Sequence, residues 1–220
     1  MRRVRNPVLI VSTITWLLLL AEPASTPIFA HCTADVDGTM PVNASLGMLL
    51  TMSSPLSLAA GWALMLVAMM SIALIAPIHH VRMQSFTNRR LRSIGLFLAG
   101  YAVLWMALGG VTLTIELVVR VLTHRSYLPA AAALLIALVW QCSPIKQRCL
   151  NRCHAHTALA AFGFTADMDA FRFGFTQGMW CAGSCWALML FPMLLPQGHV
   201  TAMAVVTLLI FSERLERPKP

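Results

Sequence analysis

The chain has 220 residues, of which 58% are hydrophobic and only 11% charged, and its mean hydropathy is +0.74. These values argue against an ordinary soluble domain and place the chain among membrane proteins. The formal net charge is +8. The positions of the basic residues, described below, explain this charge without a nucleic-acid partner.

Six apolar runs approach the ~20 residues that a helix needs to cross a ~30 Å hydrocarbon layer. In chain order they cover residues 7–21, 56–77, 94–119, 128–142, 173–195 and 199–211. The first run follows three arginines and fits either a signal peptide or an anchor helix. The anchor is favoured because Pro23 and Pro27 interrupt the region where a cleavage site would stand.

The basic residues predict how the six runs are oriented. With the N-terminus in the cytoplasm, fourteen of the sixteen Lys and Arg residues fall on the inner side, and only Arg120 and Arg125 fall outside. Inner loops of membrane proteins carry such an excess of positive charge. The sequence therefore predicts an all-α, polytopic membrane helix bundle with about six transmembrane helices and both termini in the cytoplasm.

Sulfur side chains are concentrated in the fifth run, in the segment MWCAGSCWALM. Residues four apart lie on one face of a helix, so Cys181, Cys185 and Met189 are expected to form one stripe. Thiolates and thioethers are ligands that select Cu(I). The same residues also fill apolar space between helices, and the spacing leaves a soft-metal site and plain packing both open.

The second run offers a possible partner for this stripe. Met65 and Met69 are four residues apart, with Met70 beside them. If the second and fifth helices touch within the bilayer, their sulfur atoms would converge on one another. A methionine stripe is also a common way to fill irregular apolar space.

A second group of possible ligands follows the fourth run, in WQCSPIKQRCLNRCHAH. A helix that begins after Pro144 would align Cys149, Cys153 and His156 on one face. The basic residues between them are expected to lower the thiol pKa values and so favour thiolates. His79, at the inner end of the second run, is either an additional ligand here or a solvated interfacial residue.

Several of these motifs occur together, in order and at fixed spacings. They comprise Trp62, Met65, Ala68, Met69 and Met70; Gly100, Tyr101 and Trp105; Gln141, Pro144, Lys146, Cys149, Leu150 and Cys153; Gly174, Gly178, Cys181, Gly183, Cys185, Trp186, Leu188 and Met189; and Glu213 with Arg214. In this combination residues 61–218 resemble a bacterial family of predicted metal-binding integral membrane proteins. That family includes a copper-chaperone-like protein associated with a bacterial polyphenol oxidase.

The resemblance implies copper handling in the bacterial inner membrane, with supply of the metal to a copper enzyme. The family pattern often has adjacent cysteines before the tryptophan, whereas Ser184 stands at the first of these positions here. Cys185 is therefore the ligand that the resemblance carries over. Residues 1–55 are expected to form an anchor helix and an external loop, and residues 56–220 a five-helix metal-binding membrane domain.

The leading hypothesis is a membrane chaperone or conduit for Cu(I), which contacts lipid and either a copper-dependent enzyme or other membrane subunits. Its predicted ligands are Cys149, Cys153, His156, His79, Cys181, Cys185, Met189, Met65 and Met69. An enzyme is the less favoured class: a thiol oxidoreductase coupled to quinone would use Cys149 and Cys153 as its reactive pair. A structural accessory subunit, in which the sulfur and small residues only pack helices, is the third alternative.

Overall fold

The computed structural model describes residues 2–21, 55–123, 127–155, 157–160, 162–195 and 197–215. Every regular element among these residues is helical, so the predicted all-α class is confirmed. The α-helices are α1 (Arg2–Ala21), α4 (Pro55–Met70), α5 (Ile75–Gln84), α6 (Arg90–Thr123), α7 (Leu128–Gln141), α8 (Pro144–Cys153), α9 (Gly163–Leu194) and α10 (His199–Leu215). Two short 3₁₀ turns, η1 (Ile72–Leu74) and η2 (Thr87–Arg89), connect α4 to α5 and precede α6.

Each predicted apolar run lies in helical structure, but the second is not one continuous helix. It breaks at η1, and its two halves meet at an angle of 61°. Pro77 lies in the first turn of α5, where its missing N–H is tolerated; within an uninterrupted helix its ring would clash with the preceding turn. The second apolar run, residues 56–77, is therefore a bent helix pair, which still counts as one candidate span if both halves cross together.

Two helical segments are long and apolar enough to cross a membrane, Arg3–Ala21 and Thr87–Val119. Two bent pairs, α4 with α5 and α7 with α8, bring the number to four if each pair forms one span; the second pair bends by 71°. These counts refer to the part of the chain that the structure describes. The six spans and the cytoplasmic termini remain predictions.

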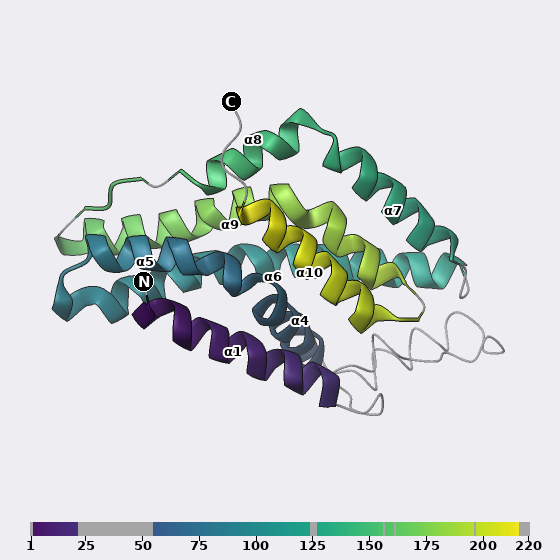
Figure 1. Ribbon diagram of the computed structural model, residues 1–220, viewed down its shortest axis with the longest axis horizontal. Coiled ribbons are helices and arrows are strands. Elements are labelled where there is room, and N and C mark those ends of the chain that lie inside the picture. Colours follow the sequence, from purple (N-terminus) through teal and green to yellow (C-terminus); the bar gives the residue numbers. More distant parts are fainter. Residues whose placement is uncertain are drawn as a thin grey trace.

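Helix α9 organises the bundle, since α6, α7, α8 and α10 all pack against it (Figure 1). Glycines allow the α6 and α9 backbones to touch. A Cβ atom on Gly174 would lie 2.0 Å from the carbonyl oxygen of Phe97, and one on Gly100 would lie 2.2 Å from that of Phe171. Such approach between helices requires residues without side chains.

The polar beginning of α9 is held by ion pairs. Arg89 and Arg92 donate to the two carboxylate oxygens of Asp167, at 2.8 Å and 2.6 Å. These contacts fix the start of α9 against the start of α6. On the other side of the bundle, α1 packs along α4 and α5 (Figure 1). The predicted external loop lies outside the described residues, and the division into residues 1–55 and 56–220 remains a prediction.

Candidate metal centre

The two cysteines of the fifth run face the interior of the bundle. Cys181 and Cys185 lie one turn apart on α9 and are only 2% and 1% exposed. The Cys185 thiol donates to the carbonyl oxygen of Cys181 at 3.0 Å, and the hydroxyl oxygen of Tyr101 lies 3.3 Å from the sulfur of Cys181. Both thiols therefore face other helices of the bundle.

Helix α8 brings two more thiols to the same part of α9. A Cβ atom on Gly183 would lie only 2.8 Å from the sulfur of Cys149; this thiol therefore rests on the side of α9 opposite Cys181 and Cys185. Gln177 donates to the carbonyl oxygen of Cys153 at 3.1 Å. Cys153 belongs to the same buried cluster as Cys181 and Cys185, whereas Cys149 packs behind it.

The predicted methionines share one buried cluster with these thiols. Its sulfur-containing members are Met65, Met69 and Met70 on α4, Cys153 on α8, Cys181, Cys185, Met189 and Met193 on α9, and Met203 on α10. The sulfur side chains of the second and fifth runs therefore meet in the core. Met193 and Met203 had not been among the predicted ligands, because no regular spacing connects them to the others.

Of the two predicted histidine ligands, only His79 lies among the described residues. Helix α8 ends at Cys153, and His154 caps it, so the expected single helix face from Cys149 to His156 is wrong; His156 itself lies outside the described residues. His79 is half-buried on α5. Its neighbour His80 has a ring nitrogen 2.9 Å from the carbonyl oxygen of Thr157.

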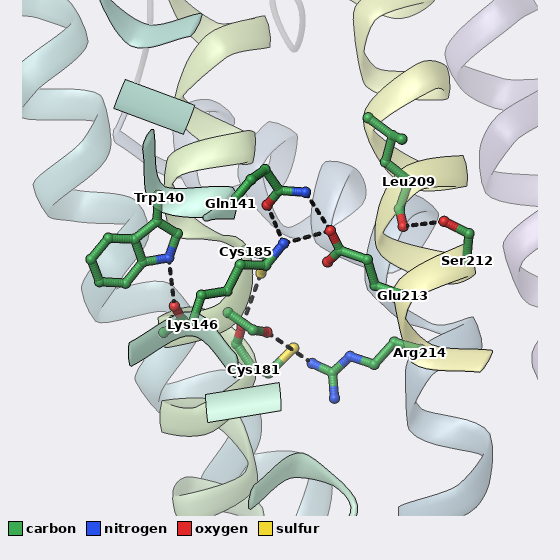
Figure 2. Close-up of polar contacts among 11 residues, drawn as sticks. Trp140, Gln141, Lys146, Cys181, Cys185, Leu209, Ser212, Glu213 and Arg214 are labelled. Atoms are coloured by element: carbon green, nitrogen blue, oxygen red, sulfur yellow. Dashed lines mark hydrogen bonds and ion pairs between the residues drawn. The ribbon is translucent and has the colours of Figure 1, made fainter. Parts of the chain in front are cut away.

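A cation not predicted as part of the site reaches the thiols from the last turn of α10. Arg214 donates to the hydroxyl oxygen of Ser184 at 3.3 Å, and its positive charge acts on the thiols of Cys153 and Cys181. Figure 2 shows Arg214 pointing from α10 toward Cys181. Sequence reasoning counted this arginine only as a topological signal.

Next to Arg214, a buried polar network joins three helices. The ammonium of Lys146, a residue only 5% exposed, forms an ion pair with Glu213 and donates to Gln141, which in turn donates to Glu213 (Figure 2). Glu213 and Arg214 are adjacent in the chain. The network therefore ties α7 and α8 to the turn of α10 that carries the arginine.

The thiols of α8 do not have the lowered pKa values that the sequence suggested. Burial raises the pKa of Cys149. It also raises the pKa of Cys153 to about 12, although the charge of Arg214 opposes this shift. The nearby basic residues are engaged elsewhere or solvated: Lys146 pairs with Glu213, and Arg148 is exposed. Both thiols are therefore protonated at neutral pH, and a metal ion would have to displace their protons.

The donor chemistry of the cluster suits a soft ion of low coordination number. Within the described ranges, no group of three or more His, Cys, Asp or Glu side chains is arranged to hold a metal ion, as a structural zinc site would require. Cu(I) needs fewer ligands, since it binds two thiolates in a linear arrangement and also accepts thioethers. Thiols and thioethers are donors that a soft metal ion such as Cu(I) accepts.

Fold and site together define an all-α protein with helices long enough to cross a membrane and a buried cluster of thiols and thioethers beside one arginine. A family model described as PpoB2, a copper chaperone, matches residues 59–219. The chain belongs to this copper chaperone family, which confirms the resemblance found in its motifs and a copper-related role. No curated protein and no solved structure matches the chain.

Proposed function

We propose that this copper chaperone resides in a membrane and binds Cu(I) through the thiols of α8 and α9. The observation that carries the proposal is the burial of Cys153 together with Cys181 and Cys185 in one cluster beside Arg214. Buried thiols without a disulfide keep a monovalent ion in a site from which water is excluded. Cu(I) is the cargo here, and the recipient is a copper-dependent enzyme or another membrane subunit.

The methionines provide a second set of ligands for the same ion. Met189 lies two turns beyond Cys181 on α9, and Met65 and Met69 approach from α4. Exchange between ligands of similar softness lets an ion move with small changes in free energy at each step. In the proposed path, Cu(I) passes from the thiols to these thioethers and then to the recipient.

The outer surface of the helices supports a location in lipid, which we propose to be the bacterial inner membrane with several spans. Large apolar side chains are exposed on α1 and α7; among them are Leu17, Leu20, Leu135, Leu138 and Val139. Exposed apolar faces on this scale are costly in water and stable in a bilayer. Lipid is therefore the proposed contact of these two helices.

The decisive test is the Cu(I) content of the purified protein after removal of weakly bound metal. The wild type is expected to retain Cu(I), and the double variant Cys181→Ser with Cys185→Ser to lose it. Cys142→Ser is the matched control, because it makes the same chemical change at an exposed cysteine outside the cluster. No retention by the wild type, or equal retention by the double variant, would overturn the proposal.

The alternative functions predict different results in the same preparation. A thiol oxidoreductase would cycle Cys149 and Cys153 between thiol and disulfide with a quinone, independently of metal, as alkylation trapping would detect. A structural subunit would become less stable when the cysteines are replaced, and its copper content would not change. Either result would replace the chaperone proposal.

A further inference from the structure

Arg214 brings a full positive charge to the thiol cluster. It is half-buried and donates to Ser184, which is three residues from Cys181 on α9. Its charge acts on the thiols of Cys153 and Cys181. Figure 2 shows its guanidinium directed at the cysteine side of α9. The arginine is thus placed where it acts on whatever the two thiols bind.

The charge of Arg214 is not cancelled by a carboxylate in the described residues. The neighbouring cation Lys146 pairs with Glu213, and the other ion pairs join Arg89 and Arg92 to Asp167. The partners of Arg214 are instead a hydroxyl and thiol groups. In a site of low dielectric constant, such a charge interacts strongly with its surroundings.

The net charge of the loaded site depends on the ion. Two metal-bound thiolates carry two negative charges. With a monovalent ion the complex keeps one negative charge, which the guanidinium balances. With a divalent ion the complex is already neutral, and the guanidinium would remain uncompensated at a cost in free energy.

From this geometry we propose that Arg214 selects monovalent over divalent soft cations at the Cys153 and Cys181 thiols. The inference rests on the proposed function and adds to it the residue that sets metal specificity. Sulfur ligands alone would not make this distinction, because thiolates bind Zn²⁺ as well as Cu(I). The arginine adds discrimination by charge.

The test compares Ag⁺, a monovalent soft ion that does not change oxidation state, with Cd²⁺. Dissociation constants for both are measured by competition on the purified full-length protein in detergent. Arg214→Gln is expected to reduce the preference for Ag⁺ over Cd²⁺ at least tenfold, which corresponds to about 1.4 kcal/mol. Arg214→Lys keeps the charge and is expected to stay within about threefold of the wild type.

Two further variants keep the test independent of folding and of general charge effects. Arg148→Gln removes an exposed positive charge beside Cys149 and is expected to leave the preference unchanged. If Arg214→Gln loses its helical circular dichroism, Ser184→Asp takes its place. The new carboxylate lies beside the guanidinium, cancels its charge and should lower the preference in the same way.

The outcomes separate the two proposals. If the wild type binds no Ag⁺, the proposed function itself fails. If it binds Ag⁺ and the folded Arg214→Gln and Ser184→Asp variants keep the wild-type preference, only the role of Arg214 is overturned. An equal drop in Arg148→Gln would also overturn it, because the effect would then be one of overall charge.

Discussion

Replacing Gly183 with alanine is expected to weaken Cu(I) binding through a single contact between α8 and α9. The new Cβ atom would lie 2.8 Å from the sulfur of Cys149, whereas ordinary contacts begin at 3.4 Å. The sulfur must therefore withdraw by about 0.6 Å. A metal site tolerates deviations of only about 0.2 Å in its ligand distances, so a displacement of α8 by this contact should move Cys153, one turn beyond Cys149 on the same helix, away from the thiols of α9.

The expected loss is roughly tenfold to a hundredfold in Cu(I) affinity, the range seen when the support of a metal ligand is disturbed. The fold should survive. Overpacking costs about 1–3 kcal/mol, and alanine in a helix recovers up to about 1 kcal/mol relative to glycine. The affinity is measured by competition with a chromophoric Cu(I) chelator, and stability by thermal unfolding followed by circular dichroism.

Gly95→Ala is the matched control, because a Cβ atom there meets nothing within 4 Å. It should bind Cu(I) like the wild type and unfold at the same or a higher temperature. If Gly183→Ala binds as tightly as Gly95→Ala, the position of Cys153 does not affect the ion, and α8 would contribute only packing to the site.

Three other predictions follow from the same contacts. Ser184→Cys should raise Cu(I) affinity severalfold, because it places a thiol beside Arg214; an unchanged affinity in chelator competition would contradict this. Because the pKa of Cys153 is raised to about 12, the binding of Cu(I) must release the proton of this thiol. The Cu(I) affinity should therefore rise about tenfold per pH unit between pH 6 and 8. A flat pH profile would show that Cys153 is not a ligand. Lys146→Met should destabilise the fold by about 3 kcal/mol, because Glu213 loses its ion-pair partner. The double variant Lys146→Met with Glu213→Leu should recover most of this stability. Unfolding midpoints measure both effects, and an equal loss of stability in the single and double variants would contradict the pairing.

Hydropathy predicted the helices well, because each apolar run is long enough to dominate its local structure. It did not predict the bend between α4 and α5, since the average over a run hides one proline. Pro77 carried the signal: a helix ends or restarts near such a residue. It also did not predict the full length of α9, which begins ten residues before Phe173 in a polar segment held by the Asp167 ion pairs.

The sulfur residues of the site were predictable from residue type and spacing, whereas their polar partners were not. Neither Lys146 nor Arg214 was predicted to be buried in contact with other helices, because such residues usually lie in water. Their burial depends on contacts between α7, α8 and α10, which no local pattern reports. The one available signal was that Gln141, Lys146, Glu213 and Arg214 all belong to the family motifs.

The positions of these charges imply an order for copper transfer along α9. Charged groups are costly in hydrocarbon, so Lys146 and Arg214 place the thiols near the inner boundary of the proposed membrane domain. Met193 lies twelve residues after Cys181, about 18 Å farther along the helix, among apolar neighbours. Anionic thiolates therefore lie where an arginine can balance them, and the neutral thioether of Met193 lies toward the far end of α9, where the ion alone carries the charge.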